Sequence, residues 1–233
     1  MQENLDPLET ELRRMPPSAV PPELMARLRA AGAEPVIGTV AALRPEKNLP
    51  RLLRAFRLVA DVMPARLVIA GDGPERPGLE RLTSELGLSG HVCFTGYLDD
   101  PAALYRSLDV FALSSDTEQM PLSVIEAMAS ALPVAATDVG DVAAMLAPEN
   151  QAFVTAVDET ELAGAIMALA RDATLRARVG AANRTKAEAE FDQAGMDAAW
   201  GALFDGAAAP AMTGRFPTGG CHVCRRILHL LLA

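Results

Sequence analysis

Short apolar runs alternate along the chain with longer stretches in which apolar residues recur at helical spacing. The runs are rich in β-branched residues and occupy 36–41, 66–71, 91–96, 109–114, 133–137 and 152–157. Because the runs do not strictly alternate with polar residues, they are typical of strands buried on both faces of a parallel sheet. Strands that alternate with helices predict an α/β fold built on a single doubly wound, Rossmann-like parallel sheet.

The segments between the runs carry signals for the starts and faces of helices. Asn48 is the expected N-cap of a helix with Pro50 in its first turn. Asp158 and Glu161 form a predicted capping-box pair at the start of another helix. Further helices are predicted at 23–31, 172–190, 192–205 and from Pro121 to about residue 131. The expected core residues of these helices are Leu52, Leu53, Phe56, Val59, Leu122, Ile125, Met128, Ala129, Leu162, Ile166 and Leu169.

Composition indicates a folded protein that does not bind nucleic acid. Half of the 233 residues are hydrophobic, whereas disordered chains have too few apolar residues to offset the loss of chain entropy on folding. With 21 Lys plus Arg against 30 Asp plus Glu, the net charge is −9, and phosphate backbones require clustered cations. We expect a polar lead-in over 1–32, one domain over 33–206 and a flexible tail over 207–233.

The cysteines and the chain ends point to a cytoplasmic protein. Three cysteines make no disulfide framework, and Cys93 reads as a small buried hydrophobe. Cys221 and Cys224 form one CxxC, whereas a zinc site usually takes two such pairs, so we interpret them as incidental thiols. The N-terminal residues do not resemble a signal peptide, and the final ILHLLLA is too short to span a bilayer. Peripheral contact with the inner membrane face is compatible with this pattern.

A basic loop follows the first predicted strand. In a doubly wound sheet, ligands bind beside the carboxyl ends of the strands. Between Arg44 and Arg57 there are five cations and one acid, in a chain of the opposite net sign. We interpret Arg51, Arg54 and Arg57 as a solvated helix face. Arg44 and Lys47 precede the helix and suit a diphosphate, because Lys supplies a point charge and Arg a planar fork.

An acidic loop follows the fourth predicted strand. Glu118 and Glu126 are eight positions apart, with Pro121 at the expected helix start. The amides of Met120, Leu122 and Ser123 would be among the unpaired donors there and would favour an anion. At helical rise the two carboxylates lie about 9–12 Å apart, roughly the distance from the sugar of a nucleoside diphosphate sugar to its ribose. Alternatively, the helix dipole favours Glu118 and Glu126 is merely an exposed glutamate.

From about residue 35 to 205 the chain resembles the nucleotide-sugar-binding C-terminal domain of GT-B fold glycosyltransferases, in the retaining group often called family 4. The matching segments are GTVAALRPEKNLPRLLRAF, LVIAGDGPERPGLE, VCFTGYLDD, LYRSLDVFALSS and TEQMPLSVIEAMASALPVAATDVGDV. The resemblance implies the donor half of a glycosyltransferase of polysaccharide biosynthesis. Such an enzyme transfers a hexosyl group, with retention, from a UDP- or GDP-sugar to a glycan or lipid-linked acceptor.

The resemblance also implies a role for each matching residue. Glu118 would be the catalytic residue that contacts the transferred sugar, and Glu126 would bind the ribose hydroxyls. The backbone of 96–98 would hold the base, and the amides of 120–122 the phosphates. No metal or other cofactor is expected, since the fold generally needs none and no Asp-x-Asp motif is present. The other implied donor-binding residues are Arg44, Lys47, Gly71, Gly96, Tyr97, Leu98, Met120, Pro121 and Leu122.

Two positions depart from the family pattern. Gln119 stands where the family usually has Gly, and its side chain would narrow the approach to the sugar. Ala131 stands where the family commonly has the Gly of a Gly-x-Pro turn. If that position needs a positive φ, Ala131 costs on the order of 1 kcal/mol.

Only about 34 residues precede the first predicted strand, whereas an α/β domain needs on the order of 100 or more. We therefore expect the family's N-terminal acceptor domain to be absent, and a separate acceptor-binding domain or chain to be a partner. The chain is then a fragment, a truncated product or a stand-alone donor domain. The alternative function is a truncated, non-catalytic nucleotide-binding or interaction module. An NAD-linked enzyme is disfavoured, because GDGPERPG is not GxGxxG and follows the second strand.

Overall fold

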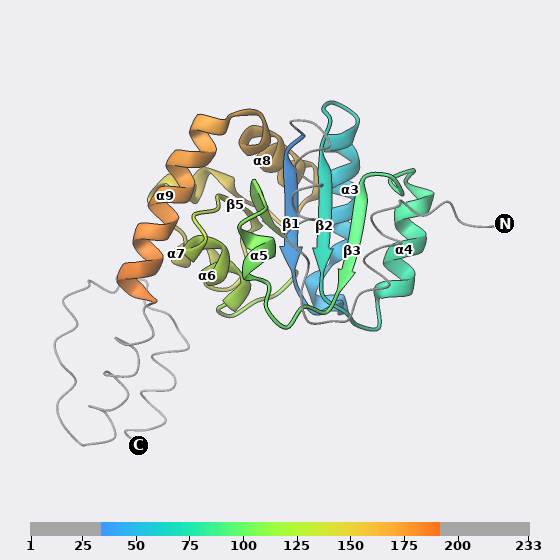
Figure 1. The fold of residues 1–233 in the computed structure, drawn as a ribbon, viewed down its shortest axis with the longest axis horizontal. Helices are drawn as coiled ribbons and strands as arrows, with labels where there is room; N and C mark the ends of the chain where they lie inside the picture. Colours follow the sequence, from blue (N-terminus) through green and yellow to red (C-terminus); the bar gives the residue numbers. More distant parts are fainter. Residues whose placement is uncertain (1–33, 192–233) are drawn as a thin grey trace, which may run out of the picture.

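Six parallel strands form the centre of residues 34–191, the part of the chain that the computed structural model describes (Figure 1). Their order across the sheet is β3-β2-β1-β4-β5-β6, which confirms the predicted doubly wound α/β fold. All six predicted strands are present, although the last begins later because a 3-10 helix, Pro148–Phe153, occupies the start of the predicted run. The strands are β1 Val36–Val40, β2 Arg66–Ala70, β3 Val92–Gly96, β4 Val110–Leu113, β5 Val134–Thr137 and β6 Val154–Thr155.

Helices cover both faces of the sheet, and each face has its own buried apolar layer (Figure 1). Along β2, Leu67 and Ile69 point into one layer, while Val68 and Ala70 point into the other. The first layer is closed by α3 Leu49–Ala60, α4 Arg76–Glu85 and α8 Glu159–Arg171. The second is closed by α5 Ala102–Tyr105, α6 Leu122–Ala129 and α7 Val142–Met145. The last helix, α9 Ala173–Glu190, contributes Val179 to the first layer and Ala187 to the second.

The predicted starts of α3 and α8 are confirmed, with one difference in detail. Asn48 caps α3 by accepting a hydrogen bond from the Arg51 amide at 3.2 Å, and the predicted core side chains of that helix are buried. Asp158 caps α8, because its Oδ1 accepts hydrogen bonds from the backbone amides of Thr160 and Glu161. The reciprocal half of the capping box is absent, since the Glu161 carboxylate accepts from the Ala156 amide instead.

The predicted core face of α6 is wrong at two positions. Leu122 is 72% exposed and Ala129 is exposed, whereas Val124, Ala127 and Met128 are fully buried. The helix begins only at Leu122, and residues spaced by three and four from Val124 face the sheet. Leu122 therefore lies on the opposite side of the first turn.

The end of α6 packs unusually closely against α9. Ala131, which stands where the family commonly has glycine, adopts φ +57°, a left-handed conformation that favours glycine. A β-carbon at Gly180 of α9 would overlap the carbonyl oxygen of Ala131. Beside this contact, buried Asn183 donates to the Leu132 carbonyl at 2.9 Å and to Asn150 at 2.8 Å. Only a glycine at 180 allows this approach of helix and turn.

Several sequence predictions lie outside the described residues. These are the lead-in over 1–32 with its helix, the helix at 192–205 and the tail with Cys221 and Cys224. Within the described part, Cys93 is buried, as predicted. Residues 34–191 contain no helix with both the length and the apolarity to cross a bilayer.

We predict opposite effects for two glycine-to-alanine substitutions in helices. Gly180→Ala should destabilise the domain by about 1–3 kcal/mol, because the new methyl group displaces the Ala131 backbone. Gly164→Ala, at an exposed position of α8 with open space around it, should stabilise by about 0.5–1 kcal/mol. Urea unfolding of both variants measures the difference, and equal effects would contradict the close α6–α9 contact.

Ala131→Gly should stabilise the domain by about 0.5–1 kcal/mol, because glycine adopts the observed positive φ without a steric cost. Thermal unfolding should then occur about 2–4 °C higher for each kcal/mol gained. Ala177→Gly, at an exposed position within α9, is the matched control and should lower the melting temperature. A melting temperature that falls in both variants would refute the strain at Ala131.

Candidate functional site

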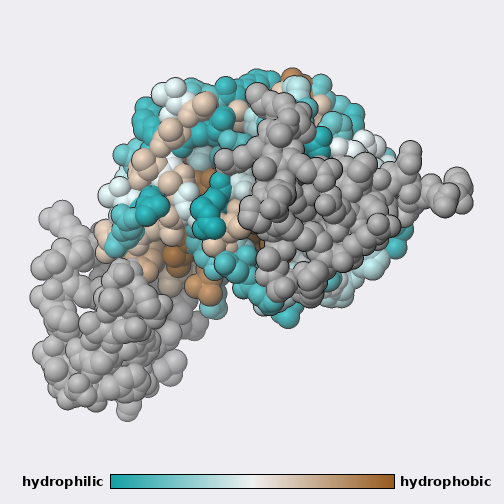
Figure 2. Space-filling view, viewed as in Figure 1, coloured by the Kyte–Doolittle hydropathy of each residue, from teal (hydrophilic) through white to brown (hydrophobic). Residues whose placement is uncertain are grey.

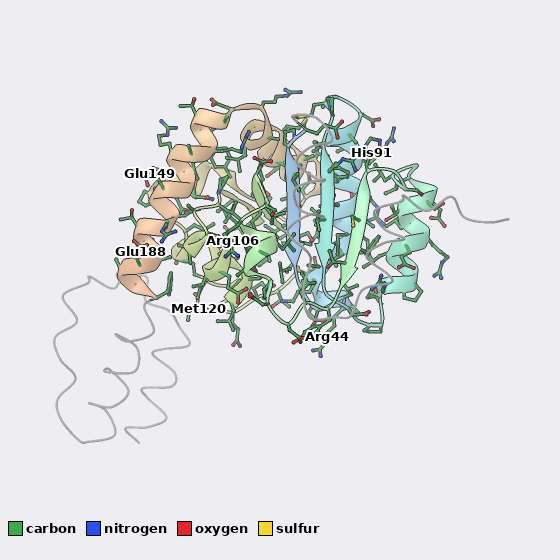
Figure 3. The ribbon with its side chains drawn as sticks, in the orientation of Figure 1. Arg44, His91, Arg106, Met120, Glu149 and Glu188 are labelled. Carbon is green, nitrogen blue, oxygen red and sulfur yellow. The ribbon has the colours of Figure 1, made fainter. Side chains whose placement is uncertain are left out.

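The strand order places a crevice at the carboxyl ends of β1 and β4. These two strands are neighbours, and the chain leaves β1 toward α3 and β4 toward α6, on opposite faces of the sheet. In open α/β sheets, ligands bind at such a reversal of strand order. Figure 3 shows Arg44 and Met120 at the edge of the molecule toward which the strands point, and His91 at the opposite end. The basic and the acidic loop therefore share one edge.

Direct contacts join the two loops. The Lys47 ammonium lies 2.7 Å from Oε1 of Glu118, and the Ser115 hydroxyl donates to the same oxygen at 2.6 Å. The Glu118 side chain is only 7% exposed, and that of Lys47 is 23% exposed. The Ser114 hydroxyl donates to the Lys47 carbonyl at 3.0 Å. Within the described residues no hydrogen bond engages Oε2 of Glu118, so one acceptor oxygen is available to a ligand.

The interpretation of Arg51 as a solvated cation is wrong. Its guanidinium donates to the Ser114 carbonyl at 2.8 Å and forms an ion pair with Asp116 at 2.7 Å, and its side chain is 14% exposed. Partial burial would raise the pKa of Asp116, but hydrogen bonds from Arg51 and Asn48 hold it below its ordinary value. Arg54, by contrast, is about half exposed, as predicted. Arg51 therefore links the start of α3 to the segment that follows β4 through a hydrogen bond and an ion pair.

Arg44 and the start of α6 leave their polar groups available to a ligand. The Arg44 side chain is exposed, and within the described residues it has no ion pair or side-chain hydrogen bond. No side chain caps the N-terminus of α6, where Pro121 stands just before the helix. The side chains of Met120 and Leu122 are exposed beside it. A cation and a positive helix end thus flank the Lys47–Glu118 pair.

The glycine-rich loop after β2 lies against the loop after β1. Gly71 has φ +131°, and a β-carbon there would overlap the carbonyl oxygen of Ala41. The Gly71 amide donates to the Gly96 carbonyl at 2.8 Å, which ties this loop to the end of β3. The backbones of the first three strands can approach this closely only because residue 71 has no side chain.

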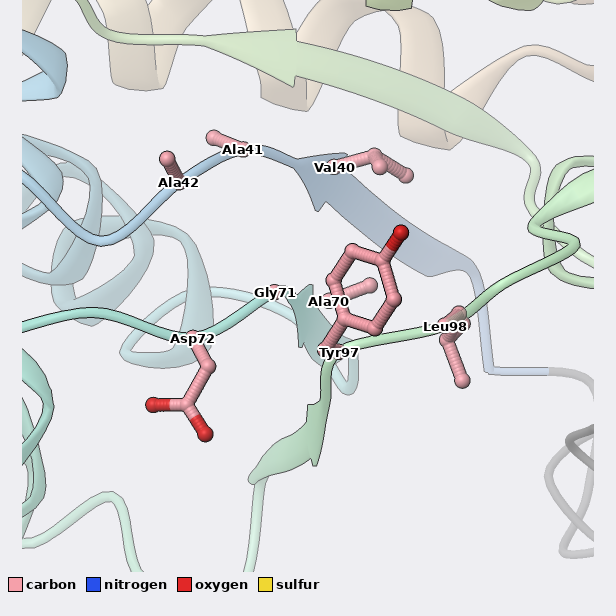
Figure 4. Close-up of a pocket in the computed structure, with 8 residues that line it drawn as sticks. All are labelled: Val40, Ala41, Ala42, Ala70, Gly71, Asp72, Tyr97 and Leu98. Carbon is pink, nitrogen blue, oxygen red and sulfur yellow. The ribbon is translucent and has the colours of Figure 1, made fainter. Parts of the chain in front are cut away.

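A small cavity opens where these three strands end (Figure 4). It has a volume of about 210 Å³, and the Tyr97 ring stands over it with its hydroxyl toward Val40. The Tyr97 side chain is 61% exposed, so one face of the ring is free to stack on a planar group. The lining residues are Val40, Ala41, Ala42, Ala70, Gly71, Asp72, Tyr97 and Leu98.

Glu126 has a buried partner that the sequence did not reveal. The Tyr105 hydroxyl donates to Oε2 of Glu126 at 2.7 Å, while the tyrosine itself is 1% exposed. Burial, together with the hydrogen bond and negative charge of Glu126, raises the pKa of Tyr105 well above its ordinary value. In the sequence Tyr105 has only the signature of an apolar core position. No local pattern marks its hydroxyl as part of a site.

Gly140 is a second residue that sequence reasoning missed. It has φ +57°, and a β-carbon there would overlap the carbonyl oxygen of Glu118. The next amide, that of Asp141, donates to the Gln119 carbonyl at 3.1 Å. The loop after β5 therefore clamps the backbone that carries Glu118. Among the described residues, no group of three His, Cys, Asp or Glu side chains is arranged to hold a metal ion.

A family model and curated relatives both match this chain to glycosyltransferases. A family model described as "Glycosyl transferases group 1" matches residues 21–186. The lipopolysaccharide core biosynthesis glycosyltransferase LpsE of Rhizobium meliloti is 32% identical over 155 residues, which are 66% of this chain and 45% of that protein. A GDP-mannose-dependent alpha-mannosyltransferase of Mycobacterium tuberculosis is 35% identical over 153 residues, 65% of this chain and 38% of its own.

Solved structures share the fold at lower identity. Anabaena HepE in complex with UDP-glucose aligns with a TM-score of 0.71 at 23% identity, over 82% of this chain and 54% of HepE. The C-terminal domain of the Francisella tularensis group 1 glycosyl transferase LpcC aligns with a TM-score of 0.62 at 21% identity. That alignment covers 72% of this chain and 92% of the LpcC domain. The chain spans about half the length, or less, of the full-length relatives that it matches.

The ion pair between Arg51 and Asp116 should make the free energy of unfolding depend on pH. The folded pKa of Asp116 lies below its unfolded pKa, so its contribution is present above about pH 4 and is lost as the pH falls through the folded pKa. Asp116→Asn should therefore cost up to about 1 kcal/mol at pH 7, a small value because the carboxylate is half exposed, and progressively less toward pH 2. Urea unfolding across this range measures the effect.

Asp99→Asn is the control for this experiment. Asp99 is exposed and has no ion pair or side-chain hydrogen bond to another described residue. Its replacement should change the free energy of unfolding little at either pH. A cost for Asp116→Asn that is the same at pH 7 and pH 2 would contradict the assigned role of Arg51.

Proposed function

The chain belongs to the group 1 glycosyl transferases, and on that premise we propose that residues 34–191 bind the nucleotide-sugar donor in a hexosyl transfer. The donor is a UDP- or GDP-sugar, and the acceptor is a glycan or a lipid-linked saccharide in polysaccharide biosynthesis. Acceptor binding belongs to a separate domain or chain. The reaction retains the anomeric configuration and takes place on the cytoplasmic side of the membrane, with peripheral contact to its inner face.

The observation that carries this proposal is the Lys47–Glu118 pair at the crevice between β1 and β4. A nucleotide sugar presents a diphosphate next to a hydroxylated ring, so its site needs cations and a hydrogen-bond acceptor side by side. Lys47 and Glu118 supply both within 2.7 Å. Arg44 and the N-terminus of α6 add positive potential at the same edge.

Each part of the donor has a counterpart in the described residues. Arg44, Lys47 and the free amides at the start of α6 bind the diphosphate. Glu118 accepts a hydrogen bond from a hydroxyl of the transferred sugar through Oε2, the oxygen that Lys47 and Ser115 leave available. Glu126 binds the ribose hydroxyls, and the base lies against Tyr97 and the backbone of 96–98 at the cavity.

Catalysis on this account is mainly electrostatic. Negative charge accumulates on the diphosphate as its bond to the sugar breaks, and fixed cations and amides stabilise that charge without reorganising. Glu118 holds the Lys47 ammonium in one position before the donor arrives, so this cation would need little reorganisation when the phosphates bind. We propose that these cations make a metal ion unnecessary. Glu118 supports the sugar as positive charge develops at its anomeric carbon.

We predict that the chain binds UDP or GDP with micromolar affinity and that single substitutions at the site strongly weaken this binding. Lys47→Ala removes the central phosphate cation, and Glu126→Ala removes the ribose acceptor. Each should weaken binding by at least about tenfold, the equivalent of one charge-assisted hydrogen bond. Isothermal titration calorimetry with the full chain measures the affinities, and circular dichroism confirms that each variant is folded.

Arg178→Ala is the matched control, because it removes one exposed cation from α9 outside the crevice. It should leave nucleotide affinity unchanged. Unchanged affinity in both site variants would refute the site. Hydrolysis of UDP- or GDP-hexose by the chain separates an enzyme from a non-catalytic module, since the module would bind the nucleotide without releasing sugar.

A further inference from the structure

Glu126 is an exposed residue on a helix surface, yet its carboxylate is held in one place. Free glutamate side chains on helices sample several rotamers, and ordering one on ligand binding costs part of the binding free energy. Here the Tyr105 hydroxyl lies 2.7 Å from Oε2 of Glu126. The orientation of the carboxylate is therefore set before any ligand arrives.

Tyr105 is itself rigid, because the core surrounds its ring. The residue is 1% exposed, and its ring lies 5.8 Å from that of Phe111 in β4 at a tilt of 38°. Val124 and Met128 of α6 belong to the same buried layer. The phenol oxygen also lies 3.3 Å from the Ser123 carbonyl in the first turn of α6. A buried ring between β4 and α6 thus places its hydroxyl beside the Glu126 carboxylate.

We propose that Tyr105 is a positioning residue that fixes the Glu126 carboxylate so that Oε1 faces the hydroxyls of the bound nucleotide. The proposal rests on the function proposed above and adds a residue that determines how the ribose is selected. Tyr105 occupies Oε2, and within the described residues no hydrogen bond engages Oε1. One oxygen of the carboxylate serves the protein and the other serves the ligand.

A phenol suits this role better than a cation does. Lys47 places a positive charge beside Glu118, whereas the neutral Tyr105 hydroxyl holds Glu126 and adds no positive charge. A charged acceptor binds a hydroxyl about twice as strongly as a neutral one. Burial also raises the pKa of Tyr105, so the hydroxyl keeps its proton across the pH range in which the protein is folded. The arrangement therefore selects ribose hydroxyls over a deoxyribose.

Tyr105→Phe tests this role, because it keeps the buried ring and deletes only the hydroxyl. The wild-type chain should bind UDP more tightly than 2′-deoxy-UDP and 3′-deoxy-UDP. The variant should bind UDP about 5- to 20-fold more weakly than the wild type does. Its affinity for at least one deoxynucleotide should fall much less, so that the ratio of the two affinities becomes smaller. If the wild type prefers GDP, the guanosine series replaces the uridine series. Thr185→Ala, which deletes an exposed hydroxyl of α9, should change neither affinity.

A double-mutant cycle separates positioning from a general structural effect. In a Glu126→Ala background, Tyr105→Phe should have no further effect on UDP affinity, because no carboxylate remains to position. Two results would overturn the role of Tyr105 and leave the proposed function standing. One is a loss of UDP affinity from Tyr105→Phe that is as large in the Glu126→Ala background as in the wild type, and the other is an equal loss for UDP and both deoxynucleotides. If the wild-type chain bound neither UDP nor GDP, the proposed function would fail and this role with it.

Discussion

The ion pair between Lys47 and Glu118 is the interaction on which the site depends. It joins the loops after β1 and β4, two neighbouring strands whose chains leave toward opposite faces of the sheet. Such a reversal opens a crevice in any doubly wound sheet, but here charged side chains tie its two sides together. Arg51 and Asp116 extend the connection toward α3. The loops that would hold a donor are therefore fixed to each other before it binds.

Backbone contacts also hold the loops of the site against one another before a ligand binds. Gly71 lets the loop after β2 lie on the carbonyl of Ala41, and Gly140 lets the loop after β5 lie on that of Glu118. Loops from four adjacent strands thus converge on one edge of the sheet, and their backbones lie in close contact. Each of the two carboxylates is held at one oxygen by the protein, Glu118 by Lys47 and Ser115 and Glu126 by Tyr105, which leaves the other oxygen for a ligand.

The fold followed from the sequence because buried parallel strands leave a periodic apolar signal that needs no tertiary information. The positive φ of Ala131 meets the condition under which the sequence predicted a cost for alanine at a position where the family commonly has glycine. The exposure of Leu122 was not predicted, because the core face of α6 depends on where the helix begins relative to the sheet. The roles of Arg51 and Tyr105 were also missed. Their partners lie 65 and 21 residues away in sequence, and only folding brings them together.

A crystal structure of the chain with UDP, or with GDP if that nucleotide binds more tightly, tests the central claim most directly. We predict diphosphate density between the Lys47 ammonium and the N-terminus of α6, ribose hydroxyls within hydrogen-bond distance of Glu126, and the base against Tyr97. The Lys47–Glu118 pair should persist, since it sets the position of the cation. Nucleotide density elsewhere on the molecule, with the crevice between β1 and β4 empty, would contradict the account.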